Sequence, residues 1–156
     1  RNFTPRFIPI TAAKNLVQDI APHSNLTRGL IIEMIELGKR QYILKKILPE
    51  SDDADLFGYS AAQYAATMNA EQNIWNYLLK MNLVYSKDPK VASQLLNEGP
   101  FSLYFGNEIP GNVGIFIGYQ IVKSWMEQQP DQEQSNLIAL LQLPAEKIFA
   151  ESKYNP

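Results

Sequence analysis

The chain has 156 residues with 14 basic and 16 acidic side chains, giving a formal net charge of −2. This length fits one domain, and an apolar fraction of 46% excludes a disordered chain. The near-balanced charge argues against binding of nucleic acids. Cysteine is absent and His23 is the single histidine, which excludes disulfides and zinc–thiolate sites and leaves little material for metal or acid–base chemistry.

The start of the sequence indicates an extended segment followed by a helix. Residues 1–10 carry two prolines and alternate apolar with polar side chains, which is typical of an extended lead-in. A helix is predicted over residues 11–20, with Pro22 closing it. Because the chain opens on Arg1, without a signal peptide or a membrane-spanning apolar run, we expect a processed product or a fragment of a longer protein.

A long helix is predicted next. Ser24 or Asn25 is suited to cap its start, and Pro49 ends it. Its apolar side chains recur every three or four residues and form a wide stripe. They are Leu30, Ile31, Met34, Ile35, Leu37, Leu44, Ile47 and Leu48.

The middle of the chain combines an acidic turn with another long helix. Residues 51–58 are acidic and turn-like, and Ser60 with Gln63 forms a capping box for a helix that reaches about Asn82. We expect that helix to bury Tyr64, Met68, Trp75, Leu78 and Leu79.

The second half of the sequence is also predicted to be helical. Asp88 and Pro89 are typical of a helix start, here of a short helix that ends at Leu96. Residues 97–109 indicate an irregular loop, and a helix runs from Pro110 to about residue 128. Two short helices separated by Pro144 are expected in residues 131–154. The sequence thus predicts an all-α, compact multi-helix domain with about six helices and no significant sheet.

An acidic cluster in the turn gives a weak calcium signal. Asp52, Asp53 and Asp55 could supply oxygen ligands, but the sixth and twelfth loop positions, counted from Ser51, hold Leu56 and Ala62 instead of glycine and glutamate. A solvated acidic turn is the favoured interpretation.

Two further features have a functional and a structural interpretation. Glu33 and Glu36 share one face of the long helix, where they could do acid–base work or bind a divalent ion; a solvated helix face is favoured. His23 is interpreted as a polar loop residue, because one histidine without cysteine cannot build a zinc site alone.

Three glycines are the most informative feature of the helix after Pro110. Gly111, Gly114 and Gly118 are spaced by three and four residues and so line one side of it. Glycine in a helix costs up to about 1 kcal/mol relative to alanine, so three on one face predict very close packing of a neighbour. We expect this neighbour to be the helix with Leu37 and Gly38; a ligand or peptide on the bare face is the alternative.

Several sequence blocks resemble a known family. They are EMIELGKRQYILKKILPES, NIWNYLLKMNLVYSKDPK, GPFS, IPGNVGIFIGYQIVKSWME and the closing ESKYNP. Together they resemble the C-terminal half of the gliding motility-associated lipoprotein B family of Bacteroidetes. The resemblance implies a lipid-anchored cell-envelope protein exposed outside the cytoplasm, periplasmic or at the outer membrane, with its lipidated cysteine upstream. It also implies association with gliding motility and type IX secretion.

The same family is distantly similar to zincin-type metallopeptidases. Their first helix carries H-E-x-x-H, and a second helix supplies a glutamate before a glycine. Here the first predicted helix has Ala12, Ala13 and Lys14 without histidine, and Leu37 stands at the degenerate ligand position beside Gly38. Lysine and leucine cannot replace imidazole and carboxylate on zinc, so the sequence predicts no cofactor and no catalytic residues.

Two functional hypotheses follow, with a weaker third. The first is a non-catalytic envelope lipoprotein domain that acts as a scaffold or binding module for motility-machinery proteins. The second is a zincin-like metallohydrolase whose metal ligands lie in missing upstream sequence. The third is a glycan or peptide binder that uses the aromatic loop with Phe101 and Tyr104 beside the glycine face. No hypothesis involves nucleic acid, and membrane contact is expected only through an upstream lipid anchor.

Overall fold

In the computed structural model the chain is described over residues 5–20 and 28–156. Within these ranges it forms eight helices and no sheet, and one isolated bridge joins Ser102 to Gly106. The predicted all-α fold is confirmed, with more helices than expected, and none of the described helices is long and apolar enough to cross a membrane. The helices are α1 (Ile8–Ile20), α2 (Leu30–Ile47), α3 (Asp53–Phe57), α4 (Ala61–Lys80), α5 (Pro89–Leu96), α6 (Val113–Glu127), α7 (Glu133–Gln142) and α8 (Ala145–Ser152).

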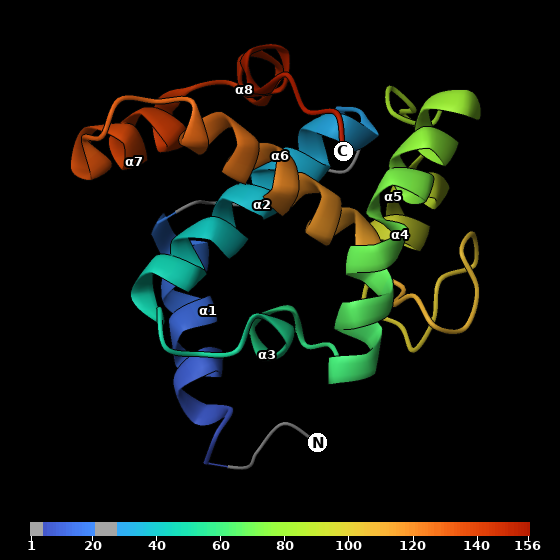
Figure 1. The fold of residues 1–156 in the computed structure, drawn as a ribbon, viewed down its shortest axis with the longest axis horizontal. Helices are drawn as coiled ribbons and strands as arrows, with labels where there is room; N and C mark the ends of the chain where they lie inside the picture. The colour runs from blue at the N-terminus through green and yellow to red at the C-terminus, as the bar shows by residue number, and fades with distance from the viewer. Residues whose placement is uncertain (1–4, 21–27) are drawn as a thin grey trace.

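Helices α2 and α6 form the centre of the molecule (Figure 1) and make its most extensive helix–helix contact. Helix α2 is buried on several faces, because other helices cover it from different sides. On α6, Ile121 and Val122 are buried whereas Lys123 and Glu127 are exposed, as the sequence predicts, and Ile115 is only half-buried. The core of the domain therefore lies around this helix pair.

Two glycines bring the backbones of α2 and α6 into direct contact. A Cβ built on Gly118 would lie 1.7 Å from the carbonyl oxygen of Met34, and one built on Gly38 would lie 2.3 Å from the carbonyl carbon of Gly118. Real Cβ atoms do not approach other atoms so closely, so only glycine fits at either position. The expected packing of Gly118 against the helix that holds Gly38 is present.

The other two glycines face different neighbours, so the prediction that all three pack on α2 is wrong. A Cβ on Gly114 would lie 2.7 Å from the carbonyl oxygen of Leu95, at the end of α5. Gly111 precedes α6, which begins at Val113 and not at Pro110, and its closest neighbour is Gly99, 3.0 Å from a built Cβ. Spacing along one helix face thus indicated close contact correctly but not its partner.

The C-terminal tail packs against α4 at the edge of the core. Trp75 on α4 makes edge contacts with the rings of Phe149 and Tyr154. Met68 and Leu79, on the other hand, are 43% and 49% exposed, so the expectation that α4 buries them is wrong. The reason is that the described helices cover α4 mainly along the face of Ile74, Trp75 and Leu78.

The N-terminal segment differs from the predicted extended lead-in. Residues 8–10 already belong to α1, because Pro9 occupies its first turn, where a missing N–H costs nothing. Residues 1–4 and 21–27, and with them His23, Ser24 and Asn25, lie outside the described residues. Gly29, with a φ of 118°, directly precedes α2, so neither residue predicted as its cap flanks the helix.

The acidic segment before α4 contains a short helix and not a solvated turn. Asp55 on α3 is buried and pairs with Arg6, and Asp53 lies 2.9 Å from Lys45. The predicted capping box of α4 is confirmed, with the backbone N–H of Gln63 donating to the Ser60 hydroxyl at 3.1 Å. Helix α5 begins at Pro89 behind its cap Asp88, also as predicted.

Candidate functional site

A cleft lies between α1, α2, α3 and the loop that precedes α6; we call it the α1 cleft. It consists of an inner cavity of about 170 Å³ and an outer cavity of about 600 Å³. Both are lined by Lys14, Phe57, Glu98 and Asn112, so they adjoin one another. The α1 cleft thus combines a small cavity with a larger one that shares part of its wall.

The inner cavity has an apolar wall contributed by several helices. In a small separate apolar cluster, α1 packs on α2 and α3 through buried residues that include Val17, Leu44 and Leu56. Leu37 on α2 is only half-buried because its side chain lines the cavity. The full apolar wall consists of Val17, Leu37, Leu44, Leu56, Phe57 and Ile115.

Besides its apolar wall, the inner cavity has two cationic side chains among its lining residues, Lys14 and Arg40. Burial lowers the pKa of Lys14, and the nearby carboxylate of Glu98 only partly opposes this effect. Burial likewise lowers the pKa of Arg40, against the opposing charges of Glu36 and Glu33. Since desolvation disfavours the charged form, an additional anion in the cavity would stabilise the Lys14 ammonium.

Two amide side chains also line the inner cavity. Gln41 on α2 and Asn112 before α6 are each 8% exposed. Neither side-chain amide makes a hydrogen bond to any residue that the structure describes, although both line the cavity. Because their polar atoms are accessible from the cavity, these groups are available to a ligand or to water.

The outer cavity is larger and has more polar walls. It is lined by Thr11 of α1, by Asp55 in its pair with Arg6, and by the backbone around Gly99 and Pro100. The hydroxyl of Tyr59 donates to the backbone oxygen of Asn112 at 3.4 Å, and burial raises the pKa of that hydroxyl. The Tyr59 hydroxyl therefore stays protonated, and the hydroxyl of Thr11 and the backbone groups of this wall can form neutral hydrogen bonds with an extended chain.

Among the candidate residues predicted from the sequence, Leu37 and Lys14 come together in the inner cavity, and Asp55 lines the outer one. Phe101 is exposed, and Tyr104 lies on the other side of the core, where its ring contacts Tyr77 and its hydroxyl donates to Gln94 at 2.8 Å. Backbone atoms fill the space beside Gly111, Gly114 and Gly118, so no open glycine surface adjoins the aromatic loop. Binding of a glycan or peptide by Phe101 and Tyr104 stays a prediction.

Sequence reasoning missed Arg40, Gln41, Glu98 and Asn112. A signal for part of the set was present, because Leu37, Arg40, Gln41 and Leu44 recur at three- and four-residue spacing and so share one face of α2. A polar pair inserted into an apolar stripe is the pattern expected for a lined cavity. Glu98 and Asn112 come from an irregular loop and gave no such pattern.

The carboxylates of α2 are structural rather than solvated, so that prediction is wrong for Glu33. Glu33 is 1% exposed and pairs with Arg28 at 3.4 Å. Buried Lys39 lies 2.8 Å from Glu36 and donates to the backbone oxygen of Leu143 at 2.7 Å. No cluster of three or more histidine, cysteine, aspartate or glutamate residues suited to a metal occurs within residues 5–20 and 28–156.

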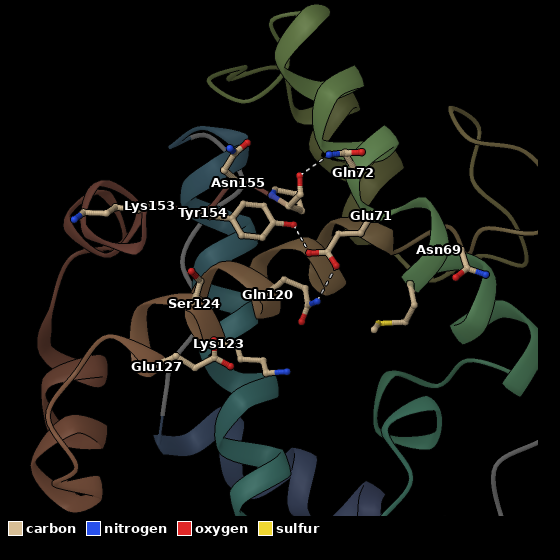
Figure 2. Close-up of a pocket in the computed structure, with 12 residues that line it drawn as sticks. Asn69, Glu71, Gln72, Gln120, Lys123, Ser124, Glu127, Lys153, Tyr154 and Asn155 are labelled. Carbon is tan, nitrogen blue, oxygen red and sulfur yellow. Dashed lines mark hydrogen bonds between the residues drawn. The ribbon is translucent and has the colours of Figure 1, made fainter.

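A second, wider cleft of about 560 Å³ lies between α4, α6 and residues 153–156, and we call it the tail cleft. Figure 2 shows the carboxylate of Glu71 at its centre, accepting hydrogen bonds from Gln120 at 2.9 Å and from the Tyr154 hydroxyl at 2.6 Å. Gln72 donates to the backbone oxygen of Pro156 at 2.9 Å. Since its central polar groups are already paired, the α1 cleft is the stronger candidate site.

The fold and the α1 cleft define a class of protein: an all-helical domain with a partly apolar cleft that carries two desolvated cations and two buried amides. The chain belongs to the family described as gliding motility protein GldB, whose model matches residues 1–156. This is a lipoprotein family, which associates the chain with gliding motility and the cell envelope. Comparisons with curated proteins and with solved structures gave no significant match.

Proposed function

We propose that this chain is a non-catalytic binding domain of a cell-envelope lipoprotein that holds a polypeptide of the gliding and type IX secretion machinery in the α1 cleft. Membership of the gliding motility family supports the cellular setting. The observation that carries the proposal is the meeting of Lys14 from α1 and Leu37 from α2 in one cavity. The lipid anchor, upstream of this domain, would hold it on the periplasmic or outer-membrane surface.

The chemistry of these two residues favours binding over hydrolysis. In a zincin-type peptidase the first and second helices would present imidazole and carboxylate to a zinc ion. On the predicted resemblance to zincins, Lys14 and Leu37 would stand on the corresponding helices. Both line the inner cavity, yet neither an ammonium nor an alkyl group binds zinc. The residues of the cavity therefore do not fit a catalytic metal, whereas its apolar wall and polar rim fit a bound chain.

A gliding assay tests this role directly. In a gliding bacterium whose own family member has been deleted, the full-length gene carrying Lys14→Glu should fail to restore spreading, because it places a third negative charge beside Glu98 and Asp55 in the cleft. The matched control is Lys123→Glu, an exposed residue of α6 away from the α1 cleft. Protein amounts must be equal in all strains. Normal spreading with Lys14→Glu would contradict the proposal.

The competing hypothesis is a metallohydrolase that completes its metal site with upstream residues. Metal analysis of the purified full-length protein distinguishes the two functions. A binding domain should retain far less than one zinc per chain after dialysis, because the inner cavity offers only the Glu98 carboxylate and no histidine or cysteine, and one carboxylate cannot hold zinc alone. Stoichiometric zinc, lost together with peptidase activity on chelation, would establish the hydrolase instead.

A further inference from the structure

The inner cavity contains more hydrogen-bonding capacity than its own residues use. Gln41 and Asn112 are both more than nine-tenths buried, and their amide groups reach the cavity without a partner in the described chain. The polar atoms of both amides stay accessible from the cavity, so a ligand can reach them. Two such groups in one small cavity point to a polar ligand that accepts or donates hydrogen bonds there.

The charges of the cavity favour an anion over a cation or a neutral group. Lys14 and Arg40 approach from α1 and α2, while Glu98 is the one carboxylate among the lining residues. Lys14 makes no hydrogen bond or ion pair with any residue of the described ranges, although Glu98 influences it at longer range. A ligand carboxylate beside Lys14 would supply the anion that this desolvated ammonium lacks.

The size of the cavity limits the apolar part of the ligand. A cavity of about 150 Å³ holds a benzene molecule. The inner cavity, at about 170 Å³, therefore accommodates one apolar side chain against Leu37 and Phe57, but not a long acyl chain. The outer cavity of about 600 Å³ has polar walls, which suit the backbone of an extended peptide better than a hydrocarbon.

We propose that the inner cavity binds the carboxyl-terminal residue of a polypeptide. Its carboxylate lies near Lys14 and Arg40, its backbone meets Gln41 and Asn112, and its apolar side chain packs on the wall around Leu37. The preceding residues run through the outer cavity. This inference rests on the proposed function and adds which part of the partner enters the α1 cleft.

Capture of a chain end uses chemistry that an internal segment cannot provide. An internal peptide bond is neutral, so it would leave Lys14 without an anion. The carboxylate end satisfies the cation and terminates the chain inside the cavity. Discrimination between a carboxylate and its neutral amide is therefore the distinguishing property of the site.

Titration of the isotope-labelled 156-residue chain by two-dimensional NMR tests the inference. The probes are a short flexible peptide ending in leucine, as the free acid and as the carboxamide. We expect the acid to shift amide signals of α1, of α2 around Leu37, and of Asn112, and to bind at least about tenfold more tightly than the carboxamide. Equal affinity of the two peptides, or no shift at the cleft with either, would overturn the inference.

Substitutions assign the effect to the cavity. Lys14→Gln should abolish the preference for the acid, while Lys123→Gln on the exposed face of α6 should leave it unchanged. The comparison of acid with carboxamide on the unaltered chain remains decisive even where a variant folds poorly. If equal peptide affinities coincided with loss of gliding in Lys14→Glu, only the chain-end inference would fail. Normal gliding in that strain would instead contradict the proposed function.

Discussion

Gly38 and Gly118 touch through their backbones: a Cβ on Gly38 would lie 2.3 Å from the carbonyl carbon of Gly118 and 2.4 Å from its oxygen. The two residues come from α2 and α6, the pair of helices at the centre of the fold. Because no side chain separates them, the distance between these helices is set by the backbone itself. The position of Leu37 and Gln41 on α2 relative to Asn112 at the start of α6, and so the shape of the inner cavity, depends on this contact.

Gly118→Ala should destabilise the domain. The added methyl group would meet the carbonyl of Met34 at 1.7 Å, so α2 and α6 must separate, and overpacking of this kind costs about 1–3 kcal/mol or more. Helix propensity alone would act in the opposite direction by about 0.8–1 kcal/mol. Urea denaturation measures whether the free energy of unfolding falls or rises in Gly118→Ala. Lys123→Ala on the exposed face of α6 should change stability little, and a Gly118→Ala variant as stable as the parent would refute the close contact.

Lys14→Met should stabilise the domain at neutral pH. Burial lowers the pKa of Lys14, so the folded state holds this proton less tightly than the unfolded state and the charge opposes folding. Removing it should raise the free energy of unfolding by about 0.5–1 kcal/mol. The gain should shrink as the pH rises through the lowered pKa toward the ordinary value of 10.5, where the parent is neutral in both states. Thermal melts at several pH values measure it; a loss of stability would show that Lys14 has a structural partner.

Ser60→Ala should weaken the start of α4. The Ser60 hydroxyl accepts a hydrogen bond from the backbone N–H of Gln63 at 3.1 Å, and the side-chain oxygen of Gln63 accepts one from the backbone N–H of Ser60 at 2.9 Å. Loss of such a cap costs about 1 kcal/mol. Ser60→Asp keeps an acceptor and should retain most of the stability in the same denaturation experiment. Equal losses in the two variants would mean that the cap is not the cause.

The contact between Trp125 and Glu151 should make the stability of the domain depend on pH in the acidic range. The indole N–H donates to the Glu151 carboxylate at 3.0 Å, and this bond, aided by Lys147, lowers the pKa of Glu151 below 4.5. The stabilisation is therefore complete above the ordinary glutamate pKa and disappears as the pH falls through the lowered value. In Glu151→Gln this part of the acid dependence should vanish. Identical pH profiles of the melting temperature in parent and variant would contradict the prediction.

The sequence by itself determined most of the helices and two of their caps. The capping box at Ser60 and the Asp88–Pro89 start of α5 are confirmed because each depends only on atoms within a few residues. Apolar periodicity likewise located α2 and α6. Boundaries were less secure: Asn112, not Pro110, precedes the first residue of α6, since a proline permits a helix start without requiring one.

Only the tertiary structure decided which helix faces were covered and what met at the cleft. Gly114 packs on Leu95 instead of α2, Glu33 is buried instead of solvated, and Met68 is exposed instead of buried. The α1 cleft likewise assembles Lys14, Arg40 and Asn112 from segments far apart along the chain. Local spacing fixes which side chains share a face because neighbours three and four residues apart are held together by the helix. Burial depends on distant segments that pack against that face, and no local pattern encodes them.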